Sequence, residues 1–291
     1  MFTSIIGTSE LAEHIGDSRW AIVDCRFLLA DEAWGDREYR IAHIPGAVYA
    51  HLDNDLSGPK TGSNGRHPLP RPDVLVQTFI RLGIGSGMQV VAYDQDSGMF
   101  ASRLWWLLRW LGHDAVAVLD GGFGKWTAER RPIEAGDSRN YARPAARFTG
   151  TPRNDMVADV DDVAAVVEHS DRLLVDARAP ERYRGEIEPL DRVPGHIPGA
   201  VNRFFQDNIG ANGVLRSPDD LRAAFSDVLG GVAPDRVICY CGSGVTACHD
   251  LLALEHAGLP GAKLYPGSWS EWCSDPSRPI EASAEKKRPA M

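Results

Sequence analysis

Short apolar runs that end at a polar or small residue recur along the chain. Continuous apolar runs of this length are typical of strands that are buried on both faces of a sheet. The predicted strands include residues 20–24, 90–93, 172–176 and 237–240. The segments 102–112 and 247–258 carry apolar residues at helical spacing, and each ends in a glycine suited to a helix C-terminus. Buried strands that alternate with helices predict an α/β fold.

The apolar pattern occurs twice, which indicates an internal duplication. The strand that ends at Asp24 corresponds to the strand that ends at Asp176, and HIPGA occurs at 43–47 and again at 196–200. Further along, the segments DGGFGKW and PGSWSEW match, and each is followed by RPIE. Matches in the same order with nearly constant spacing indicate two homologous domains rather than chance.

Two tandem domains are therefore expected, each with a central, mainly parallel sheet flanked by helices. The expected boundaries are 1–138 for the first domain, 139–155 for a linker, 156–283 for the second domain and 284–291 for a tail. The linker is rich in glycine, proline, arginine and asparagine and has no sustained periodicity. In such sheets ligands bind beyond the carboxyl ends of the strands, where each repeat places its aspartate, its histidine and its loop.

Composition narrows the class of partner. The 291 residues are 43% hydrophobic and 24% charged, as in ordinary globular proteins, and the net charge of −9 argues against a protein that binds nucleic acid or a membrane surface. No apolar run is long enough to span a membrane, and the first residues lack the basic start of a secretion signal. Five scattered cysteines favour free thiols in a reducing compartment. We therefore expect a cytoplasmic protein that acts on a small molecule.

The two halves differ at one loop, where Asp94 of the first copy is replaced by Cys241 in the second. The second loop consists of Cys241, Gly242, Ser243, Gly244, Val245 and Thr246. Its glycines allow backbone N–H groups to turn inward as an anion-binding nest, and the following helix adds its positive end. This environment favours the thiolate of Cys241 and the charge of a persulfide on it, with the hydroxyls of Ser243 and Thr246 as further donors. Cys241 is thus the candidate nucleophile.

Other catalytic classes find no support among the residues. Cysteine-dependent phosphatases need an arginine six residues after the nucleophile, and this chain has Ala247 there. The sequence contains no metal-ligand spacing, no phosphate loop and no dinucleotide-binding fingerprint. No metal and no other cofactor is therefore expected.

Several motifs together resemble the two-domain rhodanese sulfurtransferases: HIPGA in both halves, YD at the first loop, CGSGVTAC at the second, and the paired segments that end in tryptophan. The resemblance extends over nearly the whole chain. It implies two rhodanese domains of which only the second carries a nucleophile, and a ping-pong reaction through a persulfide on Cys241. The implied partners are a small-molecule sulfur donor and an acceptor, which is a small thiol, a thioredoxin-like protein or cyanide.

The same resemblance indicates the donor. Cys-Gly-Ser-Gly-Val-Thr is similar to the 3-mercaptopyruvate type, whereas thiosulfate-preferring members tend to carry basic residues after the cysteine. Arg182 matches the first of two arginines that bind the substrate carboxylate, and the second position is Leu190 here, with Arg192 two residues further on. The expected donor is 3-mercaptopyruvate, with Arg182 and Arg192 as its binding residues. Thiosulfate is the alternative donor, and a non-catalytic rhodanese-like binding module is the alternative of a different class.

Three further groups of residues are expected near the cleft between the domains. His43 and His196 occur in both copies, which favours a structural role, but His43 is also a candidate to relay a proton with Ser243. Arg103 is expected to form an ion pair between the domains. The tryptophans of the same helix are spaced as a core or interface stripe.

Overall fold

Two parallel sheets, one in each half of the chain, organise the molecule. The computed structural model describes residues 1–136, 146–169 and 172–282, so residues 139–145 of the expected linker and the whole expected tail lie outside the described residues. The strands of the first sheet are β1 (Ile5–Ile6), β2 (Trp20–Asp24), β3 (Val48–Tyr49), β4 (Gln89–Tyr93) and β5 (Val116–Leu119). The strands of the second are β6 (Leu173–Asp176), β7 (Val201–Asn202), β8 (Val237–Tyr240) and β9 (Lys263–Leu264).

The second sheet repeats the arrangement of the first strand by strand. The first has the order β1-β5-β4-β2-β3. The second, read in the same direction, has the order β9-β8-β6-β7. Every pairing between these strands is parallel, with β6 beside β8 as β2 is beside β4. In the place of β1, the second half has a single parallel bridge between Val157 and Leu264. The predicted α/β fold with two tandem sheets is confirmed.

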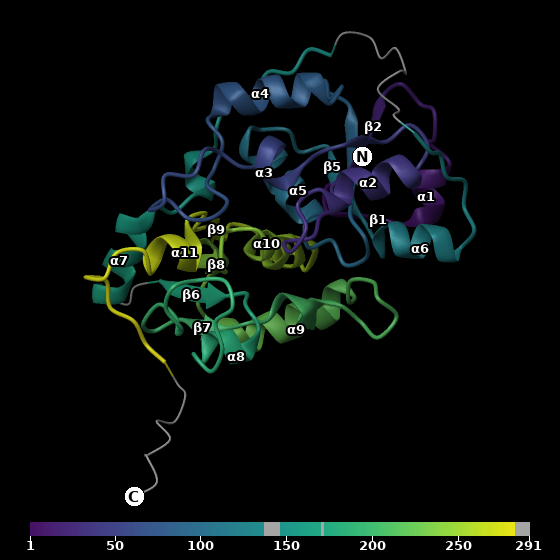
Figure 1. Ribbon diagram of the computed structural model, residues 1–291. Helices are drawn as coiled ribbons and strands as arrows, with labels where there is room; N and C mark the ends of the chain where they lie inside the picture. The colour runs from purple at the N-terminus through teal and green to yellow at the C-terminus, as the bar shows by residue number, and fades with distance from the viewer. Residues whose placement is uncertain (137–145, 170–171, 283–291) are drawn as a thin grey trace, which may run out of the picture.

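Helices lie between and outside the two sheets (Figure 1). Those of the first half are α1 (Thr8–Ala12), α2 (Trp34–Ile41), α3 (Leu52–Asp55), α4 (Pro72–Arg81), α5 (Ala101–Trp110) and α6 (Gly122–Ala128). Those of the second half are α7 (Val160–His169), α8 (Pro180–Tyr183), α9 (Pro218–Leu229), α10 (Thr246–His256) and α11 (Ser268–Trp272). Short 3-10 turns are η2 (Asn154–Met156), η3 (Phe205–Asn208) and η4 (Pro234–Arg236). Within the described ranges, no helix has the length and apolar character needed to cross a bilayer.

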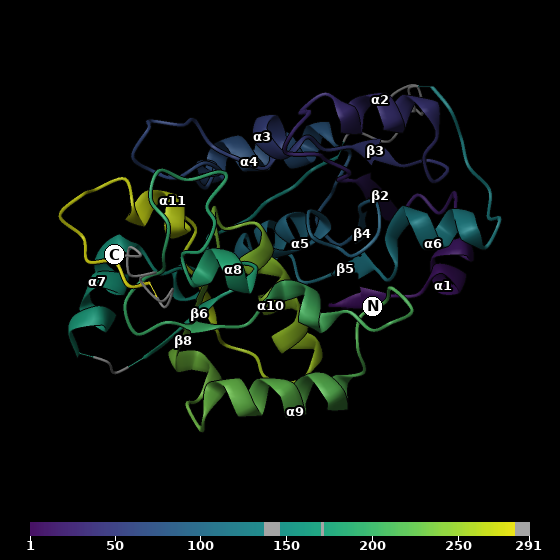
Figure 2. The same cartoon turned by 60° about the horizontal axis from the view of Figure 1, so that its bottom comes forward.

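The helices α5 and α10, which follow the two matched loops, pack against each other between the sheets (Figure 1, Figure 2). Trp105 and Trp106 of α5 are 2% and 1% exposed, and they share one continuous apolar core with Leu251 and Leu252 of α10. Separating the domains would return this apolar surface to water, which is unfavourable. The prediction of a core or interface position for the tryptophans is confirmed, and the packing of α5 on α10 brings the two loops close to the domain boundary.

Each half also carries the same buried ion pair at the end of an inner strand, β2 in the first sheet and β6 in the second. Nη2 of Arg26 lies 2.7 Å from Oδ2 of Asp24, and Nη2 of Arg178 lies 2.7 Å from Oδ2 of Asp176. A buried carboxylate is tolerated when a paired guanidinium compensates its charge. These pairs anchor the segments that follow β2 and β6, which lead toward the functional loops.

Candidate active site

Cys241 lies at the turn between β8 and α10, and its side chain is buried. The backbone N–H of Gly244 donates a hydrogen bond to Sγ of Cys241 at 3.1 Å. Gly244 has a φ of +76°, and a side chain there would place its first carbon 2.5 Å from the carbonyl oxygen of Pro266, so this curl requires glycine. The sulfur therefore lies at the start of a helix beside an inward-facing amide, where a negative charge is stabilised.

The matched loop of the first domain holds the carboxyl group of Asp94, whose pKa is raised by burial and lowered by backbone hydrogen bonds. Oδ1 accepts hydrogen bonds from the N–H groups of Asp96 and Gly98 at 3.2 and 2.9 Å. Oδ2 accepts hydrogen bonds from the N–H groups of Phe100 and Ala101 at 2.7 and 3.1 Å. The duplicated loop is thus a binding site for negative charge, which contains a carboxylate in one copy and a thiol in the other.

A pocket of about 60 Å³ opens at Cys241. Its walls come from both domains: Leu29, Arg66, His67, Met99 and Phe100 from the first, and Arg182, Leu190 and most of the Cys241 loop from the second. Sites for drug-sized molecules measure roughly 300–1,000 Å³. The pocket therefore suits a molecule of few atoms that reaches the sulfur directly.

Ser243 connects the cysteine loop to the first domain through a short hydrogen bond. Its Oγ lies 2.7 Å from Nδ1 of His67, which belongs to the segment between α3 and α4. Nε2 of His67 lies 3.6 Å from Oδ1 of Asp53 on α3. Because Nε2 faces a carboxylate, we assign the ring proton to Nε2 and let Nδ1 accept from the Ser243 hydroxyl. His67 therefore orients the Ser243 hydroxyl, which can relay a proton beside Cys241.

His67 is neutral at pH 7 in this environment. Burial lowers its pKa to about 3; the Asp53 carboxylate opposes the shift, whereas the guanidinium groups of Arg103 and Arg66 add to it. An imidazole with so low a pKa holds a proton only weakly, so His67 acts as a neutral hydrogen-bond acceptor that orients the Ser243 hydroxyl.

We expect the ring signals of His67 to show no titration between pH 8 and pH 5 in a histidine NMR experiment. An unperturbed histidine, with a pKa of about 6.5, changes its charge within this range. The variant His67→Gln assigns the signals. A titration of His67 centred near its usual pKa would contradict the neutral assignment.

His43 does not line this pocket. Its ring stacks on Tyr39, and its Nδ1 lies 2.7 Å from the carbonyl oxygen of that residue. His196 makes the same two contacts with Tyr183 in the second domain. The expected relay between His43 and Ser243 is thus corrected: His67 makes the contact with Ser243. The repeated histidines have the same supporting contacts in both copies because they belong to the duplicated fold.

Two arginines line the pocket, and Arg192 is not one of them. Arg182 on α8 lies in the wall as expected, together with Arg66 of the first domain, whereas Arg192 is exposed outside it. Nη2 of Arg182 lies 2.7 Å from Oε1 of Glu188 and 3.1 Å from Oδ2 of Asp191. The loop therefore directs Asp191 rather than Arg192 toward the pocket. This corrects the placement of Arg192 and leaves two cations balanced by two carboxylates.

Arg103 of α5 is fully buried beneath the cysteine loop. Its Nη1 donates to the carbonyl oxygen of Gly244 at 3.0 Å, and its Nη2 donates to the carbonyl oxygen of His67 at 3.0 Å. The partners of Arg103 are thus backbone carbonyls of both domains, in place of the expected ion pair. One guanidinium holds the Cys241 loop and the His67 segment in a fixed relation.

The other thiols are poorer nucleophile candidates than Cys241. All five cysteines are free and buried. Burial raises the pKa of Cys248 in α10 to about 12 and raises that of Cys239 in β8 well above its usual value. Because the thiolate is the nucleophile, these two side chains act as small apolar residues at neutral pH.

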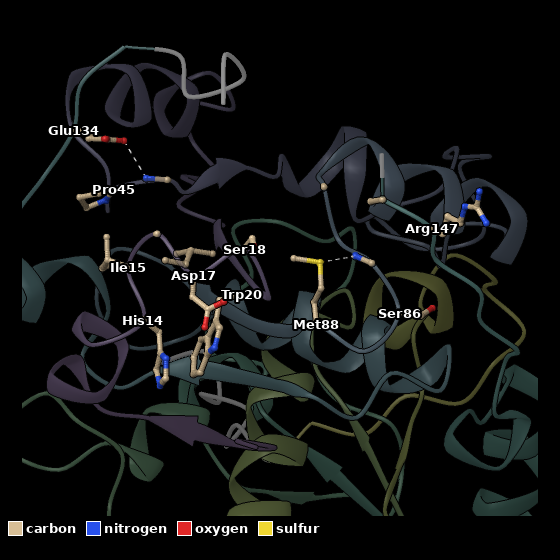
Figure 3. Close-up of a pocket in the computed structure, with 16 residues that line it drawn as sticks. His14, Ile15, Asp17, Ser18, Trp20, Pro45, Ser86, Met88, Glu134 and Arg147 are labelled. Carbon is tan, nitrogen blue, oxygen red and sulfur yellow. Dashed lines mark hydrogen bonds between the residues drawn. The ribbon is translucent and has the colours of Figure 1, made fainter. Parts of the chain in front are cut away.

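A larger cavity of about 560 Å³ lies in the first domain and shares no residue with the Cys241 pocket (Figure 3). Trp20 and Met88 line it, His14 stacks on Trp20 with 3.8 Å between ring centroids, and no cysteine contributes to it. In the part of the chain that the structure describes, no group of three or more histidine, cysteine, aspartate or glutamate residues is placed to hold a metal ion. The candidate chemistry is therefore assigned to the small pocket.

Asp53, Arg66 and His67 are site residues that the sequence-based expectations did not include. They lie between the HIPGA motif and α4, in a stretch of 24 residues whose counterpart between the second HIPGA motif and α9 has 17. The difference between the copies at Asp94 and Cys241 pointed to the nucleophile, and the same comparison is the signal that would have pointed to this stretch. No local spacing relates it to Cys241, because docking of the domains brings the two together.

Known proteins resemble this chain in sequence and in structure. The rhodanese-like domain profile matches residues 7–129 and again residues 159–275. A probable 3-mercaptopyruvate sulfurtransferase of Pseudomonas aeruginosa is 45% identical, over 95% of this chain and 97% of that protein. A putative thiosulfate sulfurtransferase of Mycobacterium tuberculosis, SseB, is 39% identical, over 95% of this chain and 96% of that protein. The crystal structure of SseA from Escherichia coli matches with a TM-score of 0.79 at 34% identity, over 93% of this chain and 100% of that one.

Proposed function

The chain belongs to the rhodanese family and is a sulfurtransferase, and we propose that its sulfur donor is 3-mercaptopyruvate. In this proposal the sulfur passes through a persulfide on Cys241 to a thiol or to cyanide. The catalytic domain is residues 156–283. The observation that carries the proposal is the Cys241 thiol at a helix N-terminus, with the N–H of Gly244 3.1 Å from its sulfur. Such donors stabilise both a thiolate and the charge of a persulfide.

In the first half of the reaction, the Cys241 thiolate attacks the donor sulfur. A sulfur–sulfur bond forms, the carbon–sulfur bond breaks, and the electron pair of the broken bond leaves on the enolate of pyruvate. The thiol proton of the donor is relayed to the enolate carbon through the Ser243 hydroxyl, which the neutral His67 orients, and this gives pyruvate. The persulfide retains one negative charge, and the amides of loop 242–246 stabilise it at the start of α10.

The charge of the pocket favours a monocarboxylate donor. The guanidinium of Arg182 matches a carboxylate through two parallel hydrogen bonds. Glu188 and Asp191 lie within ion-pair distance of Arg182, and Asp191 also pairs with Arg66. The two arginines therefore leave little excess positive charge for the dianion thiosulfate, which makes 3-mercaptopyruvate the better match.

In the second half, an acceptor thiolate or cyanide attacks the outer sulfur of the persulfide. The sulfur–sulfur bond breaks, and its electron pair returns to Cys241. Leu29 and Leu190, which are 47% and 45% exposed, form an open apolar edge of the pocket that admits a small thiol or a thioredoxin-like protein. Five free thiols and a persulfide intermediate suit a reducing compartment, so we place the reaction in the cytoplasm.

We expect kcat/KM of the wild-type protein to be higher for 3-mercaptopyruvate than for thiosulfate. We also expect Arg182→Ala to lower kcat/KM for 3-mercaptopyruvate about 10- to 100-fold. A hydrogen bond to a charged group contributes about 1.5–3 kcal/mol, and about 1.4 kcal/mol corresponds to a factor of ten. Release of pyruvate and formation of thiocyanate from cyanide measure the two donors. Arg184→Ala is the matched control, because Arg184 is exposed and pairs with Glu186.

Two results would replace the proposal. A higher kcat/KM for thiosulfate than for 3-mercaptopyruvate would make the protein a thiosulfate sulfurtransferase that uses the same persulfide chemistry. Absence of turnover with both donors, together with no gain of a sulfur atom in the intact mass of the protein, would make it a non-catalytic binding module.

A further inference from the structure

Arg66 reaches the pocket from the domain opposite to Cys241. Its side chain lines the pocket beside Arg182, and these two arginines are the cationic side chains of the pocket wall, because His67 is neutral. A side chain at Gly242, the residue after Cys241, would place its first carbon 2.7 Å from Nη2 of Arg66 and 3.4 Å from Nη1 of Arg182. The two guanidinium groups thus occupy the space beside the nucleophile that a side chain at position 242 would need.

The backbone at Arg66 is held by the second domain. The N–H of Arg66 donates to Oγ of Ser270 at 3.1 Å. A side chain at Gly65, whose φ is +84°, would place its first carbon 2.7 Å from the carbonyl oxygen of Gly267, so the two domains approach each other as closely as glycine allows. With 28% exposure of its side chain, Arg66 is presented to the pocket by a docked segment and is not a free surface arginine.

Asp191 holds the two guanidinium groups side by side. Its Oδ1 lies 3.0 Å from Nε of Arg66, and its Oδ2 lies 3.2 Å from Nη2 of Arg66 and 3.1 Å from Nη2 of Arg182. Within the described residues, these contacts and those of Arg182 with Glu188 leave Nη1 of both arginines without a hydrogen-bond partner. Each arginine therefore retains donor groups for a small anion.

We propose that Arg66 is the second donor-binding residue, which binds the carboxylate of the sulfur donor together with Arg182 from across the domain boundary. This inference rests on the proposed function, because it assumes a carboxylate donor. Two guanidinium groups on adjacent sides of the carboxylate orient the donor sulfur toward Cys241 and donate hydrogen bonds to the anion next to a thiolate that would repel it. Substrate recognition then depends on the docking of the two domains.

The test compares Arg66→Gln with Arg71→Gln in the full-length protein. Arg71 follows in the same segment, is exposed and pairs with Asp73 outside the pocket, so it controls for loss of one positive charge. We expect Arg66→Gln to raise KM for 3-mercaptopyruvate at least about tenfold with little change in kcat, because the lost contact is made in both ground state and transition state. Arg66→Lys keeps the charge without the planar fork and should recover part of the affinity. Equal KM values for the two glutamine variants would overturn the inference.

Binding to an inactive protein separates this inference from the proposed function. In a Cys241→Ser background, calorimetry should give a Kd for 3-mercaptopyruvate that rises at least about tenfold with Arg66→Gln. The double variant Arg66→Gln/Asp191→Asn should keep the defect; recovery would assign it to the unpaired Asp191 carboxylate and overturn the role of Arg66. If the wild-type protein turns over 3-mercaptopyruvate and Arg66→Gln leaves the Kd unchanged, the role of Arg66 is overturned while the proposed function stands. A wild-type protein that neither binds nor turns over 3-mercaptopyruvate overturns the proposed donor and the role of Arg66 with it.

Discussion

Replacing Cys241 by serine is expected to lower kcat/KM for sulfur transfer at least about 1,000-fold while the protein stays folded. Serine retains nearly the same volume and the contact with the Gly244 N–H, but its hydroxyl stays protonated at neutral pH and does not carry sulfur as a persulfide. Pyruvate release measures the loss of turnover. Intact mass after exposure to the donor measures the intermediate, because only the wild-type protein should gain a sulfur atom.

The matched control for this variant is Cys248→Ser. Cys248 lies in α10 and donates to the carbonyl oxygen of Gly244 at 3.3 Å, a bond that a serine hydroxyl can also make. We expect Cys248→Ser to keep most of the activity. Turnover close to wild type in Cys241→Ser, or loss of turnover in Cys248→Ser alone, would place the nucleophile elsewhere.

His67→Gln is expected to lower kcat with 3-mercaptopyruvate about 100-fold or more, the usual scale of general acid–base catalysis. Glutamine keeps a polar side chain near Ser243 but lacks the ring nitrogen Nδ1 that accepts the Ser243 hydroxyl and orients it for the proton relay. The effect on thiosulfate should be much smaller, because sulfite leaves with its electron pair and needs no proton. Steady-state rates with the two donors measure this difference directly.

His43→Gln is the control for His67→Gln, since it applies the same substitution to the histidine that the sequence favoured for this role. Its ring is buried against Tyr39, so we expect a lower melting temperature and a kcat within a few-fold of wild type. The opposite pattern, with kcat lost in His43→Gln and kept in His67→Gln, would return the proton relay to His43.

Cys241 was predictable because its surroundings are continuous in the chain. The apolar run 237–240, the glycine-rich loop and the helix α10 follow one another, and together they place a thiol at a helix N-terminus. The first domain contains the other copy of this pattern, and it added a comparison because Asp94 occupies the position of Cys241 there. Periodicity and turn chemistry are local properties, so they are visible without knowledge of the tertiary structure.

The cations of the pocket were predictable only in part. Arg182 was identified by its match to the family's first carboxylate-binding arginine, and it lies on α8, shortly after β6. Arg192 lies in an irregular loop, where the pairing of Asp191 with Arg66 and Arg182 decides which side chain turns inward. That pairing involves a residue of the other domain, so no inspection of the loop sequence reveals it.

By itself, the sequence determined the duplication, the two parallel α/β sheets, the tryptophan stripe of α5 and the candidate nucleophile, because each follows from a pattern within one continuous stretch. Only the tertiary structure decided which histidine meets Ser243 and which arginine lies beside Arg182. The burial of apolar surface between α5 and α10 drives the docking of the domains. The polar residues that this docking brings together are far apart in the chain and have no common period, so the sequence pattern leaves them unassigned.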